Sequence, residues 1–495
     1  MKNALINQDL FGNEAGDDED IEVLNSYFLS KPEFDRFFSH ENRLAFVRSR
    51  KGMGKSALLR QALFRGESNN SDEIHLYLKA SDLMALQEAK STSSADQLYA
   101  WQQRICTRIN LEIGSTLKAG FSDDSIYLIE RAEVSGLRNR NIVSALFDRL
   151  NVKGGPISLD RTRLTTTDSQ AVLARVLDKK DVNVWLYIDD IDATFLNTEN
   201  DRNRVGSFFS ACRNIVSNVS GLYLRASVRT DVWSIISNYD EALDKCEQYM
   251  LDLSWSTSET GKIIEKKICS FFQRNYSDDE RISSVVSTNN ADKIRNLIFK
   301  EPFTWSGRPL ESFRPIHILS AGRPRWAAQL CKMAGKDAHD KNFNRIAMPN
   351  IRAALEKYGQ LRMSDLYKEH RHQCPQLEDI IETFSGCQKR YSSRDLLKHI
   401  TEKIIKRIGF PKIDGITADK GSISIAAFLY RIGFIAARDD GEVNTLGFIR
   451  FEDRPNLLST TANLDDGMNW EIHPSYRNVL RIKSGGHSDQ FDEKE

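Results

Sequence analysis

The chain has 495 residues, enough for two to four domains, and its 28% charged and 9% aromatic residues are typical of globular proteins. Lys+Arg and Asp+Glu both number 69, so the overall charge does not indicate nucleic acid or an anionic membrane as a partner. The seven cysteines lack paired spacing, no apolar run is long enough to span a bilayer, and the N-terminus lacks a signal-peptide pattern. We therefore expect a soluble, cytoplasmic protein with reduced thiols and no membrane contact.

The first segment, residues 1–40, is predicted to be an N-terminal lead-in followed by a first helix. Residues 1 to about 24 are polar, which predicts a flexible lead-in. Leu10 and Phe11 are the exception, because they are apolar and could dock on the core.

Residues 44–59, LAFVRSRKGMGKSALL, have the pattern of a strand, a glycine-containing loop and a helix start. The unpaired N–H groups and the partial positive charge of a helix N-terminus bind phosphate oxygens, and glycines let the backbone approach them. Lys55 would reach the β- and γ-phosphates, and the Ser56 hydroxyl would ligate Mg²⁺. Ser49 departs from the GxxxxGK[ST] pattern, since it replaces the first glycine. The predicted phosphate-binding residues are Gly52, Met53, Gly54, Lys55, Ser56 and Ala57.

Residues 182–188, VNVWLYI, form a continuous apolar run that ends at Asp189 and Asp190. Continuous apolarity predicts a strand buried on both faces of a parallel sheet, and ligands bind at the carboxyl ends of such strands. Asp189 would hold Mg²⁺, and Asp190 would orient the attacking water. Strands and helices alternate over 41–255, so we predict an α/β fold with a P-loop NTPase core, a parallel sheet flanked by helices.

Three arginines are candidate catalytic residues because they follow the core strands or begin a later helix. Arg229 lies just after the predicted strand over 221–227 and either senses the γ-phosphate or forms an ion pair with Asp192 or Asp231. Arg323 and Arg325 lie at a helix start, where they either act as a lid sensor or are solvated.

The second half of the chain is predicted to be mainly helical. We expect a helical lid over 256–340 and a helical, winged-helix-like C-terminal domain over 341–495, with a turn at 439–441. The predicted helix over 424–432 offers one cation, Arg431, so protein contact is favoured there over DNA recognition.

The order of SRKGMGKS, WLYIDDID, LRASVRTDVW and SAGRPRW resembles bacterial P-loop ATPases of the AAA+/STAND/KAP-like (ASCE) kind, which are often encoded beside antiphage or mobile-element genes. The resemblance implies ATP and Mg²⁺ as ligands, and a nucleotide state that controls self-assembly or an effector protein. It implies the phosphate and Mg²⁺ roles for Lys55 and Ser56, the Mg²⁺ role for Asp189 and the water-orienting role for Asp190. Arg229 would be the first sensor and Arg323 or Arg325 the second.

Three functions remain open at this point. The first is a regulatory ATPase whose nucleotide state controls assembly or a partner effector, with a place in antiphage defence. The second is a nucleotide-binding scaffold with little turnover, which the changes at Ser49 and Asp190 favour. The third is a DNA-loading or initiator-type ATPase that uses the C-terminal domain.

Overall fold

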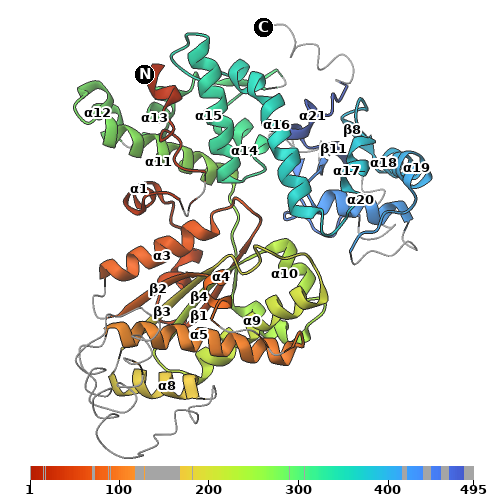
Figure 1. The fold of residues 1–495 in the computed structure, drawn as a ribbon. Coiled ribbons are helices and arrows are strands. Elements are labelled where there is room, and N and C mark those ends of the chain that lie inside the picture. Colours follow the sequence, from red (N-terminus) through yellow and green to blue (C-terminus); the bar gives the residue numbers. More distant parts are fainter. Residues whose placement is uncertain are drawn as a thin grey trace, which may run out of the picture. The chain divides into compact units, whose positions relative to one another are not determined.

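The computed structural model divides into two compact units, each described separately below (Figure 1). The sheet unit comprises Ser30–Leu253, and the helical unit comprises Met1–Leu29 with Ser254–Glu495. The structure describes residues 2–14, 16, 18–69, 73–86, 89, 91–116, 128, 168–180, 182–288, 290–305, 307–414, 421–438, 448–458 and 468–483. The turn predicted at 439–441 lies outside these residues.

The sheet unit contains a five-stranded parallel sheet in the order β2-β3-β4-β1-β5. Every residue of β3 is buried, as its continuous apolar sequence predicts. The parallel α/β core expected from the sequence is confirmed. The strands are β1 (Leu44–Ser49), β2 (Ile74–Lys79), β3 (Val184–Asp189), β4 (Leu222–Arg229) and β5 (Met250–Asp252).

Helices cover both faces of this sheet (Figure 1). Alternating residues such as Phe46, Leu186 and Leu224 point into the main apolar core with the long helices α5 and α9, and α3 covers the opposite face. The helices of the sheet unit are η2 (Pro32–Phe34), α2 (Asp35–Phe38), α3 (Lys55–Asn69), α4 (Ala80–Met84), α5 (Ser94–Thr116), α8 (Asp168–Lys180), α9 (Glu199–Asn218), α10 (Thr230–Ile236) and η3 (Glu241–Tyr249).

Arg225 fixes the segment that leads into β1. Its side chain is fully buried and stacks on the Trp185 ring, with the guanidinium carbon 4.8 Å from the ring centroid. The guanidinium donates to the backbone carbonyls of Phe37, Ser39 and Asn42. Burial lowers the pKa of Arg225 to about 9. A buried cation therefore holds the segment that leads into β1.

The helical unit begins with an apolar core built from helices and a small hairpin. The core extends from Ala4 to Tyr358 and includes residues from both sequence segments of the unit, before Leu29 and after Ser254. The hairpin β6–β7 was not predicted, since its strands have three residues each. The elements are η1 (Lys2–Ile6), α1 (Ile21–Tyr27), α11 (Thr257–Asn275), α12 (Glu280–Ser287), α13 (Ala291–Ile298), β6 (Phe303–Trp305), β7 (Arg308–Leu310), α14 (Phe313–Leu319), α15 (Pro324–Asp340) and α16 (Met348–His370).

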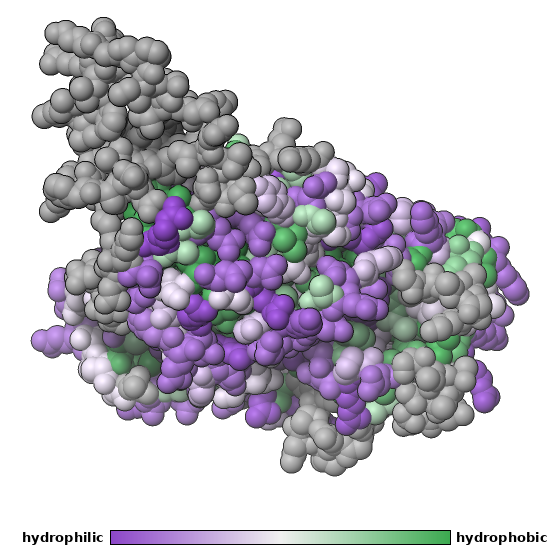
Figure 2. Space-filling model, turned by 90° about the horizontal axis from the view of Figure 1, so that it is seen from below, coloured by the Kyte–Doolittle hydropathy of each residue, from purple (hydrophilic) through white to green (hydrophobic). Residues whose placement is uncertain are grey.

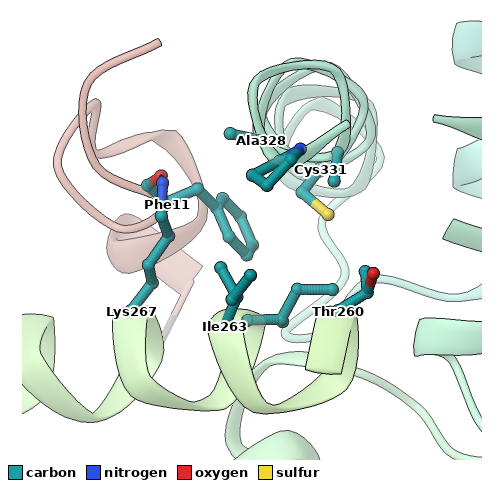
Figure 3. A pocket seen from close by; sticks show the side chains of 9 residues that line it. Phe11, Thr260, Ile263, Lys267, Ala328 and Cys331 are labelled. Carbon is teal, nitrogen blue, oxygen red and sulfur yellow. The ribbon is translucent and has the colours of Figure 1, made fainter. Parts of the chain in front are cut away.

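The N-terminal residues are a packed part of this core, so the prediction of a flexible lead-in is wrong. Phe11 is 1% exposed and lines a small apolar pocket between α11 and α15, which contribute Ile263 and Cys331 (Figure 3). The ammonium of Lys267 donates to the Phe11 carbonyl at 2.7 Å. The expected docking of Leu10 and Phe11 is confirmed, because burial of these apolar side chains outweighs the polar composition around them.

The C-terminal part has its own apolar core, which extends from Met363 to Leu480. Its antiparallel sheet has the order β10-β9-β11-β8. Helices followed by the β9–β10 pair match the predicted order of elements, and the winged-helix assignment stays a prediction. The elements are α17 (Leu377–Glu382), β8 (Arg390–Ser392), α18 (Ser393–His399), the π-helix η4 (Ile400–Ile405), α19 (Lys406–Ile408), α20 (Gly421–Arg431), β9 (Ile435–Arg438), β10 (Phe448–Ile449), β11 (Asn469–Ile472) and α21 (Pro474–Arg477).

On the face drawn in Figure 2, most described residues are hydrophilic, and hydrophobic residues lie in small separate groups. This distribution fits apolar side chains that are packed inside the cores. Among the described residues, no helix combines the length and the apolarity needed to cross a membrane.

Candidate nucleotide-binding site

The loop between β1 and α3 has the backbone of a phosphate cradle. Gly52 and Gly54 have φ angles of +80° and +103°, a region that residues with a Cβ rarely adopt. The first backbone bond of α3 runs from the Leu58 N–H to the Gly54 carbonyl. The N–H groups of Lys55, Ser56 and Ala57 therefore have no i−4 partner in the helix and can serve an anion at its N-terminus.

Lys55 reaches back across this loop. Its Nζ lies 3.2 Å from the Ser49 carbonyl oxygen and 3.5 Å from that of Arg50. Burial lowers the pKa of Lys55, although Asp192 and Asp189 favour the charged form. The side chain is partly buried, and its ammonium contacts backbone carbonyls of the loop.

Two neighbouring strands orient the Asp189 carboxylate. Asp189 ends β3 and is 2% exposed. The Tyr77 hydroxyl of β2 donates to Oδ2 at 2.9 Å, and the Ser227 hydroxyl of β4 donates to Oδ1. The sequence did not single out Tyr77 or Ser227, because each becomes informative only when the strand order is known.

Asp190, the next residue, is exposed instead of buried. Its φ of +61° lies in the left-handed region, which aspartate tolerates better than most residues. Its Oδ2 lies 4.0 Å from Nζ of Lys79 at the end of β2, and both side chains are about half exposed. The left-handed backbone at Asp190 thus leaves the Asp189 carboxylate buried and the Asp190 carboxylate exposed to solvent.

Asp192 is a site residue that the sequence analysis considered only as an ion-pair partner. It is 5% exposed and accepts a hydrogen bond from the Arg229 N–H. The Arg229 Nε lies 3.6 Å from Asp192 and 3.7 Å from Asp231, so the predicted ion pairs are both present. The spacing of the acidic residues in DDID was the available signal for Asp192.

The strand register brings the predicted core residues to one edge of the sheet. Ser49, which begins the loop, is paired with Arg229, and Lys79 is paired with Asp189. Lys55 interacts electrostatically with Asp192, Asp189, Asp231 and Arg229. The start of the β1–α3 loop, Asp189 at the end of β3 and Arg229 at the end of β4 therefore lie at the same edge of the sheet.

Arg323 and Arg325 belong to the helical unit, at the start of α15. Arg323 is 2% exposed, and its Nη1 donates to Glu369 at 2.9 Å. The interpretation of Arg323 as a solvated arginine is therefore wrong, because Glu369 compensates its charge in the interior. Arg325 is partly exposed. A sensing role for either arginine stays a prediction.

The residues present fit magnesium and a nucleoside triphosphate. The glycine conformations leave a backbone cradle, and the Ser56 hydroxyl and Asp189 carboxylate are oxygen donors of the type that Mg²⁺ prefers. The Lys55 ammonium supplies positive charge beside the cradle. The parallel sheet, the loop and the acidic strand end together decide the fold. This is a P-loop NTPase core.

Comparison with known proteins finds only distant similarities. No family model matches the chain. An 80.3 kDa protein of Escherichia coli (strain K12), ascribed to transposon gamma-delta, is 20% identical over 450 residues. That alignment covers 87% of this chain and 62% of the relative, so the chain spans about three fifths of the relative's length.

Two solved structures align over most of the chain. The ORC2 protein of Aeropyrum pernix in its ADPNP–ADP complexes is 11% identical, with a TM-score of 0.38, over 88% of this chain and 85% of its own. The ORC1 protein of the same organism in complex with DNA is 11% identical, with a TM-score of 0.34, over 93% of this chain and 95% of its own. Because both TM-scores are below 0.5, the fold assignment rests on the sheet and the loop themselves.

Proposed function

We propose that the protein is an AAA+-like ATPase that binds ATP with Mg²⁺ at the β1–α3 loop and hydrolyses it. The observation that supports this most is the buried, doubly hydrogen-bonded Asp189 at the sheet edge where the Lys55 loop also begins. A solvated acidic strand end would not need two hydroxyl donors from neighbouring strands.

The proposed roles follow from the chemistry of each group. Lys55 and the N–H groups of Gly54 to Ala57 neutralise the phosphates, and Ser56 and Asp189 hold the metal. Bound Mg²⁺ would supply charge neutralisation at the phosphate oxygens. Asp190 accepts a proton from, and orients, the attacking water, and Arg229 stabilises developing negative charge.

Titration with ATP and Mg²⁺ tests binding, and phosphate release tests turnover. We expect Lys55→Ala to abolish nucleotide binding, and Asp190→Asn to keep binding and stop turnover. Asparagine is a better replacement for Asp190 than alanine, since it tolerates the left-handed backbone at this position. Equal turnover by the wild type and both variants would refute the proposal.

The proposed biological role is regulatory: nucleotide state changes self-association or binding of an effector protein. The resemblance to ATPases encoded beside antiphage or mobile-element genes supports this role. The name of the Escherichia coli relative refers to a transposon and favours the mobile-element setting. Particle mass measured with and without ATP and Mg²⁺ tests nucleotide-controlled assembly; an unchanged mass alone and with candidate effectors would contradict it.

A nucleotide-binding scaffold with little turnover is the second candidate. The ion pair of Lys79 with Asp190 favours it, because a carboxylate that contacts an ammonium is less available to a water molecule. Sustained phosphate release by the purified full chain would exclude the scaffold, whereas tight ATP binding without release would favour it.

An initiator-type ATPase is the third candidate, and three arginines of the C-terminal part favour it as groups of the kind that contact phosphates. These are Arg390, Arg438 and Arg477, each of which forms an ion pair with the buried Glu471. Duplex DNA binding by the full chain that weakens with salt would support this role. Absence of such binding at low salt would exclude it.

A further inference from the structure

Asp192 contacts both the backbone and the side chain of one residue, Arg229. Its Oδ2 accepts the Arg229 N–H at 2.5 Å and lies 3.6 Å from the Nε of the same arginine. The Asp192 side chain is 8% exposed, so solvent screens this charge only weakly. A carboxylate that binds the backbone of an arginine and also pairs with its guanidinium restricts the directions that the side chain can take. Asp192 therefore fixes the start of α10 and the arginine that precedes it.

The turn that carries Asp192 is itself anchored in the core of the sheet unit. Ile191 and Phe195 are 1% and 4% exposed and belong to the main apolar core. The Phe195 N–H donates to the Asp192 carbonyl at 3.2 Å, and the Ala193 N–H donates to the Asp190 carbonyl at 3.1 Å. Buried side chains on either side and bonds within the turn hold its backbone, so the carboxylate has a firm base.

A second carboxylate, that of Asp231 in the first turn of α10, lies near the same nitrogen. Its Oδ1 is 3.7 Å from the Arg229 Nε, and both side chains are 17% exposed. Both distances to Nε exceed the length of a hydrogen bond, so the two acids act on the arginine side chain through charge. Two fixed negative charges at similar distances thus hold the guanidinium of Arg229 at this place.

Arg229 lies beside the β1–α3 loop in the same sheet. In the parallel register of β1 and β4, it is paired with Ser49, at the start of the loop. The Ser49 carbonyl oxygen is in turn 3.2 Å from the Lys55 Nζ. The arginine that Asp192 fixes is therefore a neighbour of the phosphate-binding loop, within one compact unit.

We propose that Asp192 is a positioning residue for Arg229: together with Asp231, it holds the guanidinium in the orientation that binds the γ-phosphate. This inference rests on the proposed function, in which Arg229 stabilises charge on that phosphate. It gives Asp192 a task that differs from those of the metal-binding Asp189 and the water-orienting Asp190. Three acids within four residues would then serve the metal, the water and an arginine.

The ratio of ATP to ADP affinity, measured by titration with Mg²⁺ on the full chain, tests the proposal. We expect Arg229→Ala to lower this ratio about tenfold, within the usual range of coupling between sites. Asp192→Asn should lower it about fivefold, because asparagine keeps an oxygen for the Arg229 N–H and loses only the charge. In an Arg229→Ala background, Asp192→Asn should leave the ratio unchanged, since it acts through Arg229.

Phosphate release gives a second readout that a merely structural role would not move. We expect Asp192→Asn to lower kcat more than it raises KM, because a fixed cation matters most where negative charge develops in the transition state. A loss of folded protein would instead lower the affinities for ATP and ADP alike and leave their ratio unchanged.

Asp201→Asn is the matched control. Asp201 also accepts backbone N–H groups, from Leu196 and Thr198, and its carboxylate is 3.1 Å from the Arg204 Nη2. These contacts lie at the start of α9, so the variant should keep the wild-type ratio. Asp231→Asn should lower the ratio about threefold, and it tests the proposal even if Asp192→Asn fails to fold.

The outcomes separate this inference from the proposed function. If the wild type binds no nucleotide, or binds it as well after Lys55→Ala, both fail. If Arg229→Ala lowers the ratio but Asp192→Asn and Asp231→Asn keep it, only the inference fails. Equal affinity of the wild type for ATP and ADP, an unchanged ratio in Arg229→Ala, or a further loss from Asp192→Asn in that background also overturns the inference.

Discussion

The Asp189 carboxylate depends on two hydroxyl groups that differ in how easily they can be replaced. Tyr77 is a large side chain on β2, whereas Ser227 is small and lies on the central strand β4. Removing the Ser227 hydroxyl leaves the packing almost unchanged, so its effect reports on the carboxylate itself.

We expect Ser227→Ala to weaken Mg²⁺-dependent ATP binding about tenfold, because a hydrogen bond to a charged group contributes about 1.5–3 kcal/mol. Titration of ATP at several Mg²⁺ concentrations measures the effect. Ser207→Ala is the matched control, since Ser207 is also buried and donates to the Ser94 carbonyl at 2.9 Å. Equal losses in both variants would show that Ser227 has only a structural role.

Lys79 offers a second test at the level of single residues. Its ammonium is 4.0 Å from the Asp190 carboxylate, and both groups are about half exposed. An exposed pair of this kind is weak and is screened by salt. We expect Lys79→Ala to raise phosphate release a few-fold at low salt and less at high salt, and exposed Lys245→Ala to change nothing. A fall in turnover would mean that Lys79 itself assists the reaction.

The conformations of single residues in the β1–α3 loop were predictable from the phosphate-loop sequence pattern. Gly52, Gly54 and Lys55 have the conformations and surroundings that the loop pattern predicts. Ser227 was not predictable as a site residue, because its contact with Asp189 follows from the strand order, and for Asp192 the spacing of the acidic residues was the available signal. The burial of Arg323 was hidden for the same reason, since Glu369 lies 46 residues away.

At the level of elements, the β1–α3 loop depends on backbone conformation more than on space. A Cβ on Gly54 would meet only Ala57, at 4.0 Å, so the φ of +103° is the constraint. We expect Gly54→Ala to reduce nucleotide affinity about tenfold, given about 1–2 kcal/mol for a left-handed residue. Gly307→Ala, at φ +72° in open space, should keep the affinity. Titration compares the two, and undiminished binding by Gly54→Ala would contradict the prediction.

The N-terminal arm, residues 2–14, should respond to alkaline pH through Lys267. Burial lowers the pKa of Lys267 to about 8 from its ordinary 10.5. Between these values the unfolded chain holds a proton that the folded chain has lost, so this group makes the free energy of unfolding rise with pH. We expect Lys267→Met to flatten that rise in urea unfolding between pH 8 and 10. Identical slopes in both proteins would contradict the assignment.

Elements with a strong periodic pattern were predictable from the sequence. The long helix α5 buries Trp101, Ile105 and Ile109 on one face, as its spacing indicates. The short strands β6, β7 and β8 were missed, because three residues carry too little pattern. The N-terminal arm was misjudged because its burial depends on α11 and α15, which come more than 240 residues later in the chain.

On the scale of the whole molecule, the buried His317 and His473 and the partly buried His399 make the helical unit less stable in acid. Burial lowers the pKa of His317 and His399 to about 4 and that of His473 to about 3, from an ordinary 6.5. Below pH 6.5 these histidines bind protons in the unfolded chain but stay neutral in the folded chain. The free energy of unfolding therefore falls as the pH falls towards 4. Each fully buried histidine contributes at most about 1.4 kcal/mol per pH unit.

Urea unfolding of the full chain at pH 7, 6 and 5 checks this prediction. We expect the double variant His317→Gln, His473→Gln to lose stability less steeply between pH 6.5 and 5 than the wild type. His339→Gln is the control, since this histidine lies on the accessible side of α15 and is partly exposed. A parallel decline in all three proteins would show that other groups dominate.

The division of the chain has a consequence for synthesis on the ribosome. The sheet unit interrupts the helical unit in the sequence, since Met1–Leu29 belongs with Ser254–Glu495. Because domains fold in order as they emerge, the strands from β1 to β5 are complete while the partners of Phe11 in α11 and α15 are still to be made. We expect the β1–α3 loop to form early, and residues 2–14 to pack only after α11 and α15 have been made.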